Sequence, residues 1–153
     1  MIHNNTKICF KKFEVIFEER PEGTELTIPI EVGSGRVDIT SKPFNAKGGC
    51  HYKIILGYMV SEPLNDLQIH IHTFKKSMPF GRDVQKIGEV HGNSNNLEFL
   101  FPSFGWEQPS SQSSSMGEYT IKMYFKDGKD NELATFFYSF NVTPDWVNVL
   151  PTN

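Results

Sequence analysis

The sequence lacks any apolar run approaching the roughly 20 residues that a membrane-spanning helix needs. Its N-terminus, MIHNNTKICFKK, lacks the apolar core of a conventional secretory signal peptide. Cysteine is scarce: the chain has Cys9 and Cys50, which form neither a CxxC pair nor a cysteine–histidine cluster. We therefore expect no metal site at the cysteines, and reduced thiols of the kind found in cytoplasmic proteins rather than a disulfide.

Motifs of the common catalytic sites are missing as well. The chain has no GxSxG elbow, no Walker loop and no dinucleotide-binding fingerprint. His70 and His72 would share one face of a strand, but no third ligand lies near them in the sequence, so we expect solvent-facing or packed histidines. An enzyme would need a constellation of distant residues such as His70, His72 and His91. The sequence thus predicts neither a cofactor nor an enzymatic activity.

A surplus of positive charge is also absent. The chain has 15 lysines and arginines against 18 aspartates and glutamates, and its net charge of -3 argues against a general nucleic-acid binder. Glutamates crowd the N-terminal third, where they form either a solvated face or a surface for a partner with a basic segment. These residues are Glu14, Glu18, Glu19, Glu22, Glu25 and Glu31.

Aromatic residues are abundant, with 13 Phe, 5 Tyr and 2 Trp among 153 residues. Most of them fall in runs where apolar and polar residues alternate, which is typical of half-buried β-strands. A hydrophobic fraction of 38% is enough for a core and excludes disorder over most of the chain. The alternating runs cover residues 13–17, 26–32, 52–60, 67–71, 97–101, 119–125 and 136–142.

Turn residues separate these runs, and no long segment has apolar residues at helical spacing. Turns are indicated at 21–23, 33–35, 47–49, 62–63 and 127–130, and a serine-rich loop at 110–115. About eight or nine strands would fit in a chain of this length. The sequence therefore predicts one all-β domain, an antiparallel β-sandwich.

Several short segments, in this order and spacing, resemble the Rho GDP-dissociation inhibitor family. KGGCHYKI at 47–54 is similar to the family's K-E-G-x-x-Y-R-I, HTFKK at 72–76 to H-T-Y-R-K, and EFLFP at 98–102 to E-F-L-T-P. EQP at 107–109 resembles an acidic E-E-A-P loop. MGEYTIK at 116–122, with Phe125 and Asp127 beyond, resembles R-G-x-Y-x-I-K-x-x-F-x-D, and NVTPDW at 141–146 resembles the family's closing strand and final D-W. A weaker likeness at 13–30 extends the resemblance over nearly the whole chain.

The resemblance implies an immunoglobulin-like sandwich with an apolar pocket between its sheets. Such a pocket takes the geranylgeranyl or farnesyl group of a GDP-bound Rho/Rac-type small GTPase, and the protein thereby extracts the GTPase from membranes and keeps it in the cytoplasm. The resemblance implies no cofactor, no nucleic acid, no stable membrane insertion and a monomer in the free state. The family often has tryptophans where Phe136 and Tyr138 stand. The prenyl-binding positions implied are Val15, Phe44, Tyr52, Ile54, Ile121, Phe136 and Tyr138.

The resemblance also implies positions that contact the GTPase. Glu107 matches the acidic loop, which faces the basic segment beside the prenylated cysteine, and Asp127 and Asp130 lie in a neighbouring turn of the motif. Asp83 matches an aspartate that the family uses against the body of the GTPase. An apolar slot combined with carboxylates has a clear physical purpose, because a lipid anchor plus a basic segment is what holds such proteins on membranes.

The predicted boundaries are a short N-terminal segment at 1–9, the sandwich at 10–146 and a tail at 147–153. The family usually has a long N-terminal arm that slows GDP release; we expect it to be largely absent and inhibition of GDP release to be weak. Two alternatives remain open: a general prenyl-binding chaperone of the phosphodiesterase delta type, and a β-sandwich interaction module without a lipid slot.

Overall fold

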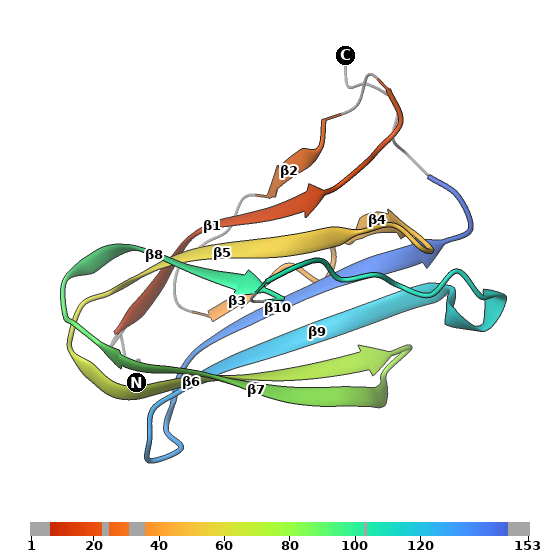
Figure 1. The fold of residues 1–153 in the computed structure, drawn as a ribbon. Coiled ribbons are helices and arrows are strands. Elements are labelled where there is room, and N and C mark those ends of the chain that lie inside the picture. The colour runs from red at the N-terminus through yellow and green to blue at the C-terminus, as the bar shows by residue number, and fades with distance from the viewer. Residues whose placement is uncertain (1–6, 23–24, 31–35, 103, 147–153) are drawn as a thin grey trace.

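The computed structural model describes residues 7–22, 25–30, 36–102 and 104–146. Within them the chain forms strands that stack in two layers (Figure 1). Their bounds are β1 Ile8–Phe17, β2 Thr27–Ile30, β3 Arg36–Asp38, β4 Phe44–Lys47, β5 Tyr52–Val60, β6 Leu64–Lys75, β7 Met78–Val90, β8 Ser94–Phe101, β9 Gly117–Lys126 and β10 Glu132–Thr143.

One layer is a 4-stranded sheet in the order β2-β1-β5-β8, and the other is a 6-stranded sheet in the order β3-β10-β9-β6-β7, with β4 also paired to β10. The predicted all-β sandwich is confirmed. The structure adds two parallel pairings, of β3 and of β4 with β10, to the antiparallel ones. They arise because the chain crosses between β2 and β5 from the smaller sheet to the edge of the larger one and back.

The alternating runs place their apolar side chains between the two sheets. Phe13 of β1 and Phe136 of β10 are 1% and 0% exposed, and their ring centroids lie 5.0 Å apart across the layers. Phe13 also contacts Tyr138, at 4.9 Å between centroids. Such aromatic pairs contribute about 0.5–1.5 kcal/mol each beyond the area that they bury. The core is thus an aromatic layer that joins the sheets.

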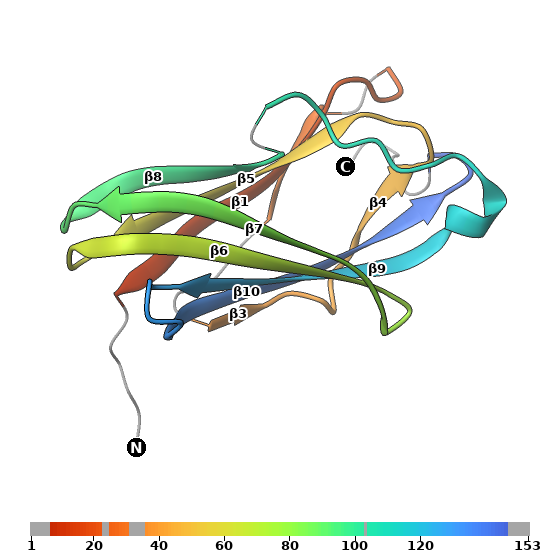
Figure 2. The same cartoon turned by 60° about the horizontal axis from the view of Figure 1, so that its bottom comes forward.

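Strand β7 forms the open edge of the larger sheet, bonded to β6 on one side (Figure 2). It runs from Met78 to Val90 and is exposed along most of its length. Because neither of its faces is consistently buried, its sequence shows no alternation, and the sequence analysis missed it along with the short β3 and β4. These strands bring the total in the described residues above the expected eight or nine.

The predicted boundaries and turns can be placed in part. Strand β1 begins at Ile8, inside the segment expected at 1–9, and the serine-rich loop contains a 3-10 turn, Ser113–Ser115. The turns predicted at 47–49, 62–63 and 127–130 are confirmed between strands. The turn predicted at 33–35 and the tail at 147–153 lie outside the described residues. No helix in the described part of the chain is long and apolar enough to cross a membrane.

Candidate functional site

A cavity of about 410 Å³ opens between the sheets, at the side where β7 and the β8–β9 loop face each other. This volume lies within the range of about 300–1,000 Å³ that is usual for small-molecule sites. Its inner wall is formed by buried apolar side chains of β5, β6, β9 and β10, including Tyr52, Ile71 and Ile121. Phe80, Asp83 and Glu107 form more exposed parts of its lining.

All the predicted prenyl-binding residues lie in the core, and they fall into two groups. Tyr52 and Ile121 line the cavity. The others fill the space between the sheets beyond it: Phe44 stacks on Phe140, a cavity residue, with centroids 5.4 Å apart, and Phe136 lies against Phe10 and Phe13. The second group is Val15, Phe44, Ile54, Phe136 and Tyr138, each at most 6% exposed.

The β8–β9 loop is held against the cavity by backbone hydrogen bonds. The Tyr52 N–H donates to the Glu107 carbonyl at 3.0 Å, and the Glu107 N–H donates to the Tyr52 carbonyl at 2.7 Å. The Gly49 N–H donates to the Pro109 carbonyl at 2.6 Å. A Cβ on Gly48 would lie 2.9 Å from the Ser110 carbonyl oxygen, so this close approach needs glycine. The turn at 47–49 thus fixes where Glu107 sits.

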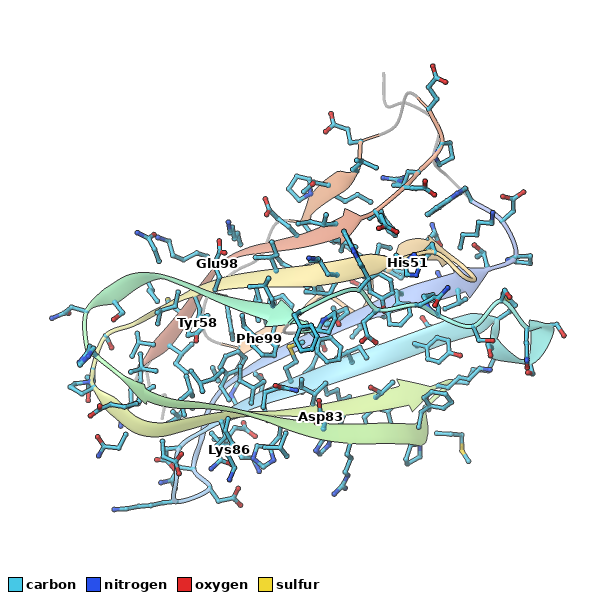
Figure 3. All side chains as sticks on the ribbon, viewed as in Figure 1. His51, Tyr58, Asp83, Lys86, Glu98 and Phe99 are labelled. Carbon is cyan, nitrogen blue, oxygen red and sulfur yellow. The ribbon has the colours of Figure 1, made fainter. Side chains whose placement is uncertain are left out.

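Two acidic residues lie at the cavity, Asp83 on β7 and Glu107 in the β8–β9 loop. Asp83 pairs with buried Ile71 across the β6–β7 ladder, so its side chain is on the inner face of the sheet; Figure 3 labels it on β7. Gln85 donates a hydrogen bond to Asp83 Oδ2 at 2.7 Å. Partial burial, and then the negative charge of Asp83, raise the pKa of Glu107. This pair of carboxylates therefore favours a positively charged group at the opening.

The Asp83→Asn substitution is expected to lower the pKa of Glu107, because it removes the second cause of its elevation. An acid whose pKa is higher in the folded chain makes stability fall as the pH rises through the window between its unfolded and folded pKa values. The substitution should reduce that fall. NMR titration of the Glu107 carboxyl measures the pKa directly, with Asp66→Asn as a control. An unchanged Glu107 pKa in Asp83→Asn would show that the two carboxylates do not interact.

No family model matches the sequence. A Dictyostelium discoideum protein that carries the name rho GDP-dissociation inhibitor 2 is 66% identical over 153 residues, which is 100% of both chains. The chain belongs to the Rho GDP-dissociation inhibitor family. A second Dictyostelium discoideum protein, with the name rho GDP-dissociation inhibitor 1, is 25% identical over 141 residues, 92% of this chain and 70% of that one.

The structure does not bring all the expected GTPase-contacting residues of this Rho GDP-dissociation inhibitor family member together. Asp127 and Asp130 follow the end of β9, whereas the cavity lies near the start of that strand, at Tyr119 and Ile121. Asp127 accepts hydrogen bonds from the Lys129 and Asn131 N–H groups at 2.9 Å each, and Asp130 pairs with Lys126 at 3.1 Å. Both carboxylates shape the β9–β10 turn, away from the cavity.

The sequence analysis did not predict some of the residues that line the cavity. Ile71, Tyr119 and Phe140 lie in predicted alternating runs on the inward parity, so the alternation itself could have found them. Phe80 is 64% exposed, and its ring lies 5.5 Å from that of Tyr119. It belongs to edge strand β7, where no periodic signal marks the inner face.

A larger recess of about 710 Å³ lies at the end of β1 and the β4–β5 turn. Its lining mixes charges of both signs, and the His51 Nδ1 and Glu18 Oε1 atoms lie 3.0 Å apart across it. Arg20 lies over the rings of Phe17 and Trp146, at 5.1 and 5.8 Å from the centroids. Since most of its lining is charged, histidine or glycine and no buried core side chain lines it, this recess suits an isoprenoid less well than the inter-sheet cavity does.

Proposed function

We propose that the inter-sheet cavity binds the prenyl group of a GDP-bound Rho/Rac-type small GTPase, so that the chain extracts the GTPase from membranes and keeps it in the cytoplasm. The observation that carries this proposal is the cavity itself, which has apolar walls between the sheets and carboxylates at its exposed side. Membership of the Rho GDP-dissociation inhibitor family supports the choice of partner. The proposed role is that of a regulator that binds and releases, not of an enzyme.

The energetic requirement of this function is simple. Each methylene of an isoprenoid that leaves water for an apolar environment contributes about 0.8 kcal/mol, so a soluble carrier must bury many of them. Tyr52, Ile71, Ile121 and Val142 supply an apolar wall for the first part of the chain. The aromatic layer behind it, with Phe44 packed on Phe140, would have to shift to admit a longer isoprenoid.

The carboxylates replace the second interaction that holds such a GTPase on a membrane. A basic segment beside the prenylated cysteine is attracted to anionic lipids, at about 1 kcal/mol per lysine or arginine. Asp83 and Glu107 offer that segment an alternative negative site when the prenyl group enters the cavity. In the free chain, partial burial and the charge of Asp83 raise the pKa of Glu107. Binding of such a cation is expected to favour the ionised form of this carboxyl group.

The Glu107→Lys substitution should weaken binding of a fluorescent, geranylgeranylated peptide with a basic segment by on the order of tenfold at low salt. The loss should shrink as salt is added, because the charges at the opening are screened by ions. Glu89→Lys, an equal change of charge near the far end of β7, serves as the control. A salt-independent loss would mean that Glu107 acts through the structure of the loop instead.

The unlipidated form of the same peptide separates the two contributions. It should bind weakly to the unsubstituted chain, since it can use only the carboxylates. If the lipidated and unlipidated peptides bound equally, the cavity would not be a prenyl site.

A further inference from the structure

The outer face of the larger sheet carries basic side chains that the cavity does not use. His70 and His72 lie on the face of β6 opposite to buried Ile69 and Ile71. Cross-strand pairing puts Arg82, His72 and Lys122 in one row, and Lys86, Gln68 and Lys126 in another. A third row, Val84, His70 and Tyr124, lies between these two, and we call the three rows together the outer basic face.

Aromatic rings are interleaved with these cations. The Lys122 Nζ lies 5.2 Å from the centroid of the Phe74 ring and 5.3 Å from that of Phe137. The rings of His72 and Tyr124 lie 5.1 Å apart, and Tyr124 contacts Phe137 at 5.5 Å. Cation–π contact holds the lysine close to the sheet. The outer basic face is therefore partly ordered, with rings beside the cations.

The acidic residues around this face lie at its margins. Glu118 is on the outer face of β9 too, but it lies at the start of that strand, outside the three rows. Asp38 pairs with Phe137 at the β3 edge, where it accepts hydrogen bonds from Thr40, and Glu132 forms an ion pair with Arg36 at 2.8 Å. Asp130 contacts Lys126, while Asp66 and Glu89 lie near the ends of β6 and β7. Along the three rows on β7, β6 and β9, the charged side chains are all basic, and of these Lys126 is paired with Asp130. A chain with a net charge of -3 thus concentrates positive charge on one face.

We propose that the outer basic face docks on the surface of a bilayer that contains anionic phospholipids. This inference rests on the proposed function, in which the chain must meet its cargo at a membrane. Charge complementarity selects the occupant, since phospholipid headgroups present the phosphate and carboxylate charges that lysines and arginines attract near a membrane surface. Aromatic side chains such as Tyr124 suit the polar boundary of a bilayer.

Strand β7 links this face to the cavity. Asp83, on its inner face, lines the cavity, whereas Lys86 pairs with Gln68 on the outer face; Figure 3 labels both residues. Contact of the outer face with a bilayer therefore brings the β7 edge, and the cavity opening beside it, toward the membrane. The acidic opening is repelled by anionic lipid but attracted to the basic segment of the cargo, so docking orients the opening toward the GTPase.

The test is sedimentation of the full chain with phosphatidylcholine vesicles, with and without phosphatidylserine. The unsubstituted chain is expected to bind the anionic vesicles in a salt-sensitive way, and the neutral ones weakly. The Lys86→Glu, Lys126→Glu double variant should lose at least about 30-fold in affinity for anionic vesicles, because two cations near the surface are reversed. Lys86→Glu alone should show an intermediate loss of affinity for anionic vesicles. Because Lys86 is exposed, this single variant should fold even if the double variant does not.

A matched control is the Lys11→Glu, Lys53→Glu double variant, which makes the same change in net charge on the smaller sheet. Equal losses in the two double variants would overturn the proposal, as would equal binding of anionic and neutral vesicles. If the Lys86→Glu, Lys126→Glu variant lost affinity for an unprenylated GTPase but still bound anionic vesicles as the unsubstituted chain does, the outer basic face would contact the protein partner instead. That result would also overturn the proposal. Uptake of a prenylated peptide in solution without vesicles tests the cavity separately. Failure of the proposed function can therefore be distinguished from failure of membrane docking.

Discussion

The Thr73→Trp variant is expected to lose on the order of 100-fold in affinity for a geranylgeranylated peptide, because an indole fills space that the isoprenoid needs. Thr73 lies on the inner face of β6, between Gly81 of β7 and Ile121 of β9, and it lines the cavity. Exclusion of about three to four methylenes, at about 0.8 kcal/mol each, accounts for a loss of this size. Fluorescence titration with the labelled peptide measures the affinity.

The control for this variant is Thr120→Trp, on the neighbouring strand. Thr120 pairs with Phe74, so a tryptophan there extends from the outer face of the same sheet. Its affinity for the prenylated peptide should match that of the unsubstituted chain, and both variants should unfold at similar urea concentrations. Equal affinity in Thr73→Trp and the unsubstituted chain would place the isoprenoid somewhere other than this cavity.

The largest expected effect on stability is that of Phe136→Ala, which should lower the free energy of unfolding by about 3–5 kcal/mol. Phe136 is 0% exposed, and its ring contacts Phe10, Phe13 and Tyr138 at centroid distances of 5.1, 5.0 and 6.3 Å. Removing the ring leaves a void where the two sheets meet. Urea denaturation, followed by tryptophan fluorescence, measures the change.

Phe104→Ala is the matched control for this prediction, since the side chain of Phe104 is 87% exposed. The same truncation there should change the free energy of unfolding by no more than about 0.5 kcal/mol. If Phe136→Ala were equally mild, the aromatic layer around Phe136 would be loosely packed in the free chain and already open to a ligand. The family resemblance assigned Phe136 to prenyl binding; in the free chain it is part of the packing that joins the sheets.

The architecture could be predicted from sequence because the information that it needs is local. Each alternating run, such as 119–125, specifies a strand with one apolar face, and several such faces can be buried only against each other. Edge strand β7 carries no such information, because residues such as Val84 and Ile87 are exposed although they are apolar. Its existence depends on pairing with β6, which no short window of sequence reveals.

The site was predictable in part for a similar reason. Tyr52 and Ile121 lie on inward positions of alternating strands, and the family resemblance selected them. The position of Glu107 depends on its backbone pairing with Tyr52, far away in the sequence. Asp127 illustrates the opposite case: the motif places it close to Tyr119 in sequence, but an extended strand carries the two to opposite ends of β9.

The most direct test of the inter-sheet cavity as a prenyl site is extraction of a GDP-loaded, geranylgeranylated Rho-type GTPase from liposomes, with GDP release followed in the same tube. The unprenylated GTPase and the Thr73→Trp variant serve as controls. The unsubstituted chain is expected to transfer the prenylated GTPase into solution, whereas Thr73→Trp should leave it on the liposomes. If the GTPase stayed on the liposomes with both chains, or left them equally well with both, the inter-sheet cavity would not be the prenyl site.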